Sequence, residues 1–271
     1  MSHFLSIRPK PQKVRSDLEL LPVRAATKSI DIPLELQRIP VEQVQLDPAT
    51  RIVLHTDPRG LAADRFRFLR LRLRERANMG AFKRILVTSP LPEDGKSTVA
   101  LNLATALADR GAQSVLLLEA DLYHPTLAQL LAVPAHPGLA ECLENGVDPM
   151  SALRRLEPLG WYFLPSGSPH GNPTELLQSE GLSGLMETVS PYFDWVVIDS
   201  PPITPLIDAL ALARHADASL LVVRAGRTPQ EAVTTACTLL GPKHVIGIIL
   251  NGVEGLNRLY GKYYGRYGGG A

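Results

Sequence analysis

Short apolar runs alternate with segments of helical periodicity through most of the chain. The pattern predicts strands at 84–88, 114–119, 195–199, 218–224 and 245–250, and helices that include 97–110, 173–189, 205–214 and 229–240. The strand segments are apolar along nearly their whole length, which is typical of strands covered on both faces. We therefore predict an α/β fold in which helices cover both faces of a parallel central sheet.

The two ends of the chain lack this alternation. Residues 1–57 show no strong periodicity and contain recurrent prolines, so we predict an extended or disordered leader with a short strand at 52–54. Residues 58–256 form the predicted folded domain. Residues 257–271 are broken up by glycines and are predicted to be a flexible tail.

An arginine-rich helix is predicted at the start of the folded domain, over residues 60–77. Helical spacing places Ala62, Phe66, Leu69 and Leu73 on one face, and Arg67, Arg70 and Arg74 on another. The basic face is either a solvated side of a packed helix or a surface that docks on an acidic partner. Spacing alone favours the solvated face.

Composition narrows the class of protein. The 271 residues are 45% hydrophobic and 20% charged with a net charge of +1, which is typical of a globular protein and argues against general nucleic-acid binding. No apolar stretch approaches the roughly 18–20 residues that span a bilayer. The two cysteines, Cys142 and Cys237, are expected to be reduced thiols of a cytoplasmic protein. Any membrane role is therefore expected to come through a partner or a surface contact.

A phosphate-binding loop is predicted between the first core strand and the following helix. Residues 89–98 read Ser-Pro-Leu-Pro-Glu-Asp-Gly-Lys-Ser-Thr, with Pro90 where the full pattern has glycine. Backbone N–H groups and the helix dipole face the phosphates in such a loop, Lys96 reaches the terminal phosphates, and Ser97 ligates Mg²⁺. The candidate nucleotide-binding residues are Pro92, Glu93, Asp94, Gly95, Lys96, Ser97, Thr98 and Asn251.

Three carboxylates follow predicted strands at the same edge of the sheet. Glu119 and Asp121 close one strand and share a side if that strand persists, and Asp199 closes another. A carboxylate at the end of a buried strand needs a partner, because a bare buried charge is costly. Beside a phosphate loop, that partner is expected to be Mg²⁺ with its waters.

The C-terminal tail concentrates the tyrosines of the chain. Four of the seven lie in the last twelve residues: Tyr260, Tyr263, Tyr264 and Tyr267. The tail could be an RNA-binding segment, a low-complexity end, or a strand that docks on a neighbour. Alternatively, its hydroxyls receive phosphate from the bound triphosphate, which would turn a basic tail acidic.

From about Asp64 to its end, the chain resembles the bacterial tyrosine autokinases (BY-kinases) of capsule and exopolysaccharide assembly. These are P-loop proteins of MinD/ParA-like architecture, unrelated in fold to eukaryotic kinases. The matching segments are the loop at 88–98, a strand ending in an Asp-x-Asp-like pair at 116–125, the strand and Asp-Ser-Pro-Pro at 193–202, Asn-Pro-Thr-Glu-Leu-Leu at 172–177, the tyrosine cluster, and an Asp-x-x-Arg-x-x-Arg helix at 64–70.

The resemblance implies an ATP- and Mg²⁺-dependent kinase that phosphorylates its own tail and regulates polymer assembly or chain length. It implies that Lys96, Glu119, Asp121 and Asp199 are catalytic, with Ser97, Asp121 and Asp199 around the metal and Glu119 orienting or deprotonating the tyrosine. Asp64, Arg67 and Arg70 would contact the next subunit of a ring, and each tail would enter a neighbour's site.

The resemblance also implies partners and a location. A membrane protein of the chain-length-regulator type would activate the kinase, and a cognate tyrosine phosphatase would reverse its action. The kinase itself would be cytoplasmic and peripheral at the inner face of the membrane through that partner.

Three departures from the family pattern leave two other hypotheses open. Glu119 stands where the family has Asp, Tyr123 where it usually has Arg, and Asp64 where it has Glu. A nucleotide-binding adaptor that has lost phosphate transfer would tolerate the first two. A MinD/ParA-like regulatory ATPase is the other hypothesis, although such proteins usually carry lysine at the position of Leu91.

Overall fold

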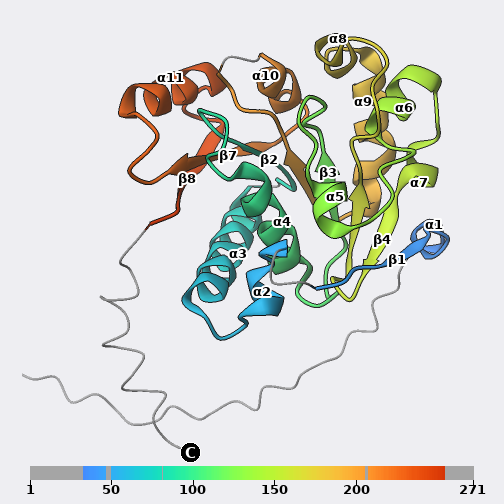
Figure 1. Ribbon diagram of the computed structural model, residues 1–271, viewed down its shortest axis with the longest axis horizontal. Helices are drawn as coiled ribbons and strands as arrows, with labels where there is room; N and C mark the ends of the chain where they lie inside the picture. The colour runs from blue at the N-terminus through green and yellow to red at the C-terminus, as the bar shows by residue number, and fades with distance from the viewer. Residues whose placement is uncertain (1–32, 47–49, 81, 205–206, 254–271) are drawn as a thin grey trace, which may run out of the picture. The chain divides into compact units, whose positions relative to one another are not determined.

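The computed structural model describes residues 33–46, 50–80, 82–204 and 207–253. Their strands form one sheet in the order β1-β4-β5-β3-β6-β2-β7-β8 (Figure 1). The strands are β1 (Val41–Gln43), β2 (Arg84–Thr88), β3 (Val115–Glu119), β4 (Arg154–Glu157), β5 (Trp161–Leu164), β6 (Trp195–Asp199), β7 (Ala218–Arg224) and β8 (Val245–Asn251).

The helices connect these strands in the alternating manner that the sequence predicts. They are α1 (Leu34–Gln37), α2 (Val53–Thr56), α3 (Leu61–Met79), α4 (Lys96–Ala108), α5 (Leu127–Leu131), α6 (Leu139–Asn145), α7 (Pro149–Ala152), α8 (Pro173–Leu177), α9 (Glu180–Val189), α10 (Asp208–Ala213) and α11 (Gln230–Leu240), with a 3-10 turn at Ser190–Tyr192.

The predicted parallel sheet is confirmed at its centre. The five predicted strands are β2, β3, β6, β7 and β8, and every hydrogen-bonded pair from β5 to β8 in the sheet order is parallel. The strands β1, β4 and β5 were not predicted. β1 and β4 run opposite to the rest because β4 pairs with β5 in antiparallel fashion. The ends of β3, β6 and β2 therefore meet at one edge of the sheet, where Glu119 lies opposite Asp199 in the register.

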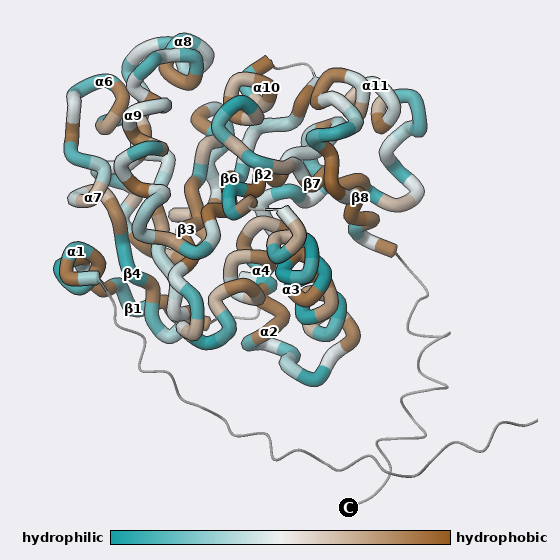
Figure 2. The backbone as a smooth tube through the Cα atoms, turned by 180° about the vertical axis from the view of Figure 1, so that it is seen from behind, coloured by the Kyte–Doolittle hydropathy of each residue, from teal (hydrophilic) through white to brown (hydrophobic). Residues whose placement is uncertain are grey.

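Two apolar layers pack on the two faces of the sheet. Along β3, Leu116 and Leu118 point into one layer and Leu117 into the other, as strand alternation requires. The helices α3, α4 and α5 contribute to the layer of Leu117, and α6 to α11 contribute to the opposite layer. In Figure 2 the central strands carry the hydrophobic colour and α3 alternates between the two extremes. The fold therefore covers both faces, as predicted.

The predicted leader ends too late, and its predicted strand at 52–54 is wrong. The helices α1 and α2 and the strand β1 all lie before residue 58, and Ile52 is completely buried as the residue before α2. The amide of Asn102 in α4 explains the helix: its oxygen accepts Val53 N–H at 2.9 Å and its nitrogen donates to Arg51 O at 2.9 Å. A tertiary contact thus decides the conformation of a segment whose local pattern favours a strand.

Other differences concern the ends of helices. The predicted helix at 173–189 is two helices, α8 and α9, which are separated at Gln178 and Ser179. In the predicted arginine-rich helix, Phe66, Leu69 and Leu73 face the core as expected, but Ala63 is buried in place of Ala62. The tail with its four tyrosines and the first 32 residues lie outside the described part of the chain. No helix within the described ranges is both long and apolar enough to cross a membrane.

Candidate functional site

The phosphate loop is shaped by two residues in the left-handed backbone region. Glu93 has φ +64° and Gly95, the N-cap residue of α4, has φ +94°. Glycine is needed at 95 for two reasons, because a side chain is strained at this φ and a Cβ would lie 2.1 Å from Asn251 Nδ2. The loop therefore delivers Lys96 at the first turn of a 13-residue helix, with free N–H groups and the positive end of the dipole at the same place.

The underside of the loop is fixed from β7 and β8. Asp94 is 2% exposed; its carboxylate accepts Leu91 N–H at 3.2 Å and the hydroxyl of Thr228 at 2.7 Å. The amide of Asn251 donates to Asp94 O at 2.9 Å. Both Asp94 and Asn251 hold the loop from below in this way, and their predicted contact with nucleotide stays a prediction. Thr228 was missed, because nothing in the sequence connects it with a loop 134 positions away.

Lys96 lies among the carboxylates at the strand ends. Its Nζ is 2.9 Å from Asp121 Oδ2, and the two side chains are 14% and 3% exposed. Burial alone would lower the pKa of Lys96, but the charges of Asp199, Asp121 and Glu119 outweigh burial and raise its pKa above the ordinary value. The ammonium group therefore stays charged, and it lies on the side of the loop that faces Asp121.

Asp199 is a buried acid with one oxygen that lacks a protein partner. Burial raises the pKa of Asp199 to about 7, although the charge of Lys96 and a hydrogen bond with Ser97 oppose that rise. Its Oδ1 has no hydrogen-bond partner among the described residues. A cation, or a water bound to it, would satisfy a buried carboxylate oxygen of this kind next to a phosphate loop.

Glu119 is fully buried and does not face the same space as Asp121. Its Oε1 accepts the backbone N–H groups of Thr126 (2.8 Å) and Leu127 (2.5 Å), and its Oε2 accepts that of Ser166 (3.3 Å). The strand β3 ends at Glu119, so the alternation that would place both acids on one side stops before Asp121. Glu119 therefore joins the loop after β3, the start of α5 and the loop after β5. This geometry does not support the predicted contact with an incoming hydroxyl.

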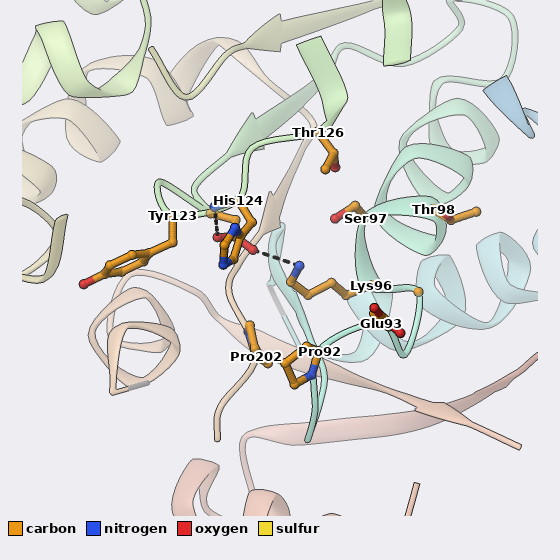
Figure 3. A pocket seen from close by; sticks show the side chains of 11 residues that line it. Pro92, Glu93, Lys96, Ser97, Thr98, Tyr123, His124, Thr126 and Pro202 are labelled. Carbon is orange, nitrogen blue, oxygen red and sulfur yellow. Dashed lines mark hydrogen bonds and ion pairs between the residues drawn. The ribbon is translucent and has the colours of Figure 1, made fainter. Parts of the chain in front are cut away.

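A cavity of about 670 Å³ opens over the loop (Figure 3). Its lining combines the loop with the segment after β3 and one residue after β6: Pro92, Glu93, Gly95, Lys96, Ser97, Thr98, Asp121, Tyr123, His124, Thr126 and Pro202. Seven of these were predicted. Tyr123, His124, Thr126 and Pro202 were not predicted to line the site, although Tyr123 and His124 lie within the matching segment 116–125. Their position just after Asp121 was the available signal.

The residues present fit Mg²⁺ in the manner of a phosphate-bound metal. Within the described ranges, no cluster of three or more His, Cys, Asp or Glu side chains is arranged to hold a metal ion. Mg²⁺ typically keeps several waters and takes one or two carboxylates together with substrate phosphates. The Ser97 hydroxyl and Asp199, which are hydrogen-bonded to each other, supply that kind of partial ligand set.

The predicted ring-contact residues on α3 are engaged within the chain. Arg67 pairs with Asp64 at 2.8 Å and donates to Pro58 O at 2.7 Å. Arg70 pairs with Asp109, the residue that ends α4, and so ties α3 to α4. These contacts leave the predicted subunit contact untested.

Comparisons with known proteins agree with a phosphate-binding site of the P-loop type. A profile of the ParA family, described as NUBPL iron-transfer P-loop NTPase, matches residues 82–239. The chain is 31% identical over 216 residues to the tyrosine-protein kinase YwqD of Bacillus subtilis (strain 168), which covers 79% of this chain and 91% of YwqD. The kinase domain of the Escherichia coli tyrosine kinase ETK superposes with a TM-score of 0.72 and 27% identity, covering 80% of this chain and 84% of that domain.

A longer relative covers nearly the whole chain. The succinoglycan biosynthesis transport protein ExoP of Rhizobium meliloti (strain 1021) is 30% identical over 262 residues, which are 89% of this chain but only 32% of ExoP. The Pyrococcus horikoshii septum site-determining protein MinD shares the fold at 21% identity and a TM-score of 0.54. The chain therefore belongs to the ParA family of P-loop NTPases and, within it, to the bacterial tyrosine-protein kinases.

Proposed function

We propose that this tyrosine kinase transfers the γ-phosphoryl group of ATP to the tyrosines of its own C-terminal tail. The observation that supports the proposal most directly is the juxtaposition of Lys96 with Asp121 and Asp199 over a loop whose helix begins at Lys96. Phosphoryl transfer relies on positioning and charge stabilisation, which this group of side chains supplies.

The proposed roles of the residues follow from their contacts. Loop N–H groups and Lys96 bind the phosphates, and Lys96 turns from Asp121 to the terminal phosphate. Mg²⁺, when bound beside Ser97 and Asp199, would neutralise charge on the phosphates. The bond that forms joins the tyrosine oxygen to the γ-phosphorus, and the bond that breaks joins that phosphorus to the bridging oxygen of ADP. The phenolic proton passes to Asp121, which lines the cavity and which Lys96 has released.

The assignment of Asp121 as proton acceptor replaces Glu119, whose oxygens are occupied by backbone N–H groups. With this assignment, glutamate at position 119 in place of the family's aspartate is compatible with phosphoryl transfer. The extra methylene lets the carboxylate reach three N–H groups that hold the wall of the site, and no reacting atom depends on it.

The tail is proposed to be phosphorylated by a neighbouring copy in a ring. The outer side of α3 supports such association, because Phe68 and Leu71 are 60% and 53% exposed beside its arginines. The names of relatives such as ExoP support a role in exopolysaccharide or capsule assembly. On the same ground we propose a membrane protein of the chain-length-regulator type as activator, which would bring the kinase to the inner face of the membrane, and a tyrosine phosphatase as its opponent.

Mixing two inactive variants tests transfer between copies. Lys96→Met lacks the phosphate-binding cation but keeps the tail, and a variant with all four tail tyrosines changed to Phe keeps the site but lacks acceptors. With ATP and Mg²⁺, neither should gain tail phosphate alone, whereas the mixture should label Tyr260, Tyr263, Tyr264 or Tyr267 of the Lys96→Met chains. A mixture that stays unlabelled while the wild type labels itself would show that transfer occurs within one chain.

A further inference from the structure

Tyr123 is an aromatic side chain at the mouth of the cavity with no role in the chemistry described above. It is 37% exposed, and among the described residues with strongly exposed large apolar side chains only Phe68 is also aromatic. In Figure 3 the ring extends outward from the loop after β3, beyond His124 as seen from Lys96. A large ring that is more than one-third exposed beside the phosphate loop indicates a surface for contact.

The ring is held rigidly at both ends. Its hydroxyl lies 2.9 Å from Thr174 Oγ1 in the first turn of α8, and Thr174 is itself fixed because its N–H donates to Asn172 Oδ1 at 3.0 Å. On the backbone side, His124 N–H donates to Asp121 Oδ1 at 3.0 Å, which fixes the loop that carries Tyr123. An incoming group therefore meets a preformed wall, which lowers the entropic cost of binding.

The lining of the cavity includes two chemically different parts. One part consists of the loop residues from Gly95 to Thr98, which suit phosphate. The other part consists of Tyr123 and His124, which follow Asp121 and offer ring surface without a carboxylate or ammonium group (Figure 3). This second part is poorly suited to a triphosphate and well suited to a planar aromatic group.

The position of Lys96 decides which aromatic group belongs there. The Lys96 ammonium lies 2.9 Å from Asp121, so the terminal phosphate is expected on the Asp121 side of the loop, and Tyr123 follows Asp121 by two positions. The acceptor must approach the terminal phosphate from outside, whereas the base of the nucleotide extends from the opposite end of the phosphate chain. The ring of Tyr123 therefore lies on the approach of the acceptor.

We propose that Tyr123 forms the aromatic wall of a slot at the mouth of the cavity, which binds the phenol ring of the acceptor tyrosine and so selects tyrosine over aliphatic side chains. This inference rests on the proposed kinase function and names the residue that recognises its substrate. Ring-to-ring contact in an offset or edge-to-face arrangement favours an aromatic acceptor. The phenol length then carries its hydroxyl past His124 toward Asp121 and the terminal phosphate.

Binding of peptide variants to Tyr123 variants tests the slot separately from phosphate transfer. The probe is a fluorescein-labelled peptide of residues 256–271, titrated by anisotropy into the full chain with a non-hydrolysable ATP analogue and Mg²⁺. Native peptide and a peptide with its tyrosines changed to Phe should bind alike, and one with tyrosines changed to Leu should bind about tenfold more weakly. Tyr123→Leu should bind all three at that weaker level, while Tyr123→Phe should keep the wild-type preference within about threefold.

Nucleotide affinity separates the slot from a base-binding role. Fluorescent ADP should bind wild type, Tyr123→Phe and Tyr123→Leu with dissociation constants within about twofold of one another. The slot is refuted if Tyr123→Leu still prefers aromatic peptides, if the wild type shows no preference, or if nucleotide affinity falls together with peptide affinity. Failure of the kinase function has a different signature, namely the aromatic preference in binding with no phosphate transferred to the native peptide.

Discussion

Single residues in the phosphate loop illustrate what a motif reveals and what it omits. The pattern Gly-Lys-Ser-Thr was sufficient to predict the cavity wall from Gly95 to Thr98. The pattern could not show that Asn251 would lie beneath the loop, because its contact with Asp94 joins residues 157 positions apart. Nor could the spacing of Glu119 and Asp121 show that the strand ends between them.

Two Gly→Ala variants separate the two reasons for glycine at position 95, which are its positive φ and the closeness of Asn251. Gly95→Ala introduces a Cβ at φ +94° that would meet Asn251 Nδ2, whereas Gly146→Ala introduces one at φ +66° with no atom within 4 Å. Both should lose about 1 kcal/mol of unfolding free energy from backbone strain. Only Gly95→Ala should also weaken binding of fluorescent ADP, by at least about tenfold, since it displaces the loop. Equal ADP affinity in the two variants would contradict the proposed packing against Asn251.

Asp199 should make the nucleotide-free protein less stable as pH rises. Its pKa is about 7 in the folded state against an ordinary 3.8, so the folded state binds the proton more tightly than the unfolded state does. The contribution of this proton to the free energy of unfolding is full below about pH 4 and is lost as pH rises through 7. Asp199→Asn should therefore be more stable than the wild type at pH 8, by at most roughly 4 kcal/mol, with the difference shrinking toward pH 4. Urea unfolding at several pH values measures this. An Asn variant that is less stable at pH 8 would contradict a net cost of burying the Asp199 charge.

At the scale of elements, Glu119 connects a strand end with a helix start and a loop. Glu119→Ala would leave the buried N–H groups of Leu127 and Ser166, and the part-buried one of Thr126, without this partner, which should cost about 3 kcal/mol of unfolding free energy. Glu187→Ala on the exposed side of α9 is the control and should change stability by less than about 0.5 kcal/mol. Urea unfolding compares the two variants, and similar losses would show that Glu119 is not a structural link.

Which strands could be predicted depended on the length of the apolar run, since β5 is fully buried but has only four residues and was missed. The strands β2, β3, β6, β7 and β8 carry long apolar runs, and these were predicted within one residue at each end. The strand β4 reads Arg-Arg-Leu-Glu and β1 has three residues, so neither has an apolar run that its sequence could reveal. Both pair with each other at one edge of the sheet, and that pairing rather than local preference makes them strands.

At the scale of the whole molecule, charge on the tail should control association. Residues 257–271 carry Arg258, Lys262 and Arg266 and no acidic side chain, so the side-chain charge of the tail is +3. Four phosphates at about −1.5 to −2 each would bring that charge to about −3 to −5. Sedimentation of phosphatase-treated and fully phosphorylated protein should show oligomers that dissociate on phosphorylation.

A tail variant controls for other sites of modification. Protein with all four tail tyrosines changed to Phe should sediment as the dephosphorylated form whether or not ATP is added. Dissociation of this variant on addition of ATP would assign the effect to nucleotide binding and not to tail charge.

The most direct measurement is the intact mass and the C-terminal peptide mass of dephosphorylated protein after incubation with ATP and Mg²⁺. The wild type should gain phosphate in steps of one group, located on Tyr260, Tyr263, Tyr264 or Tyr267, and Lys96→Met should gain none. Unmodified wild-type tyrosines, in protein that demonstrably binds ATP, would contradict autophosphorylation and leave a nucleotide-binding adaptor. Equal modification of Lys96→Met would show that the phosphate comes from another enzyme.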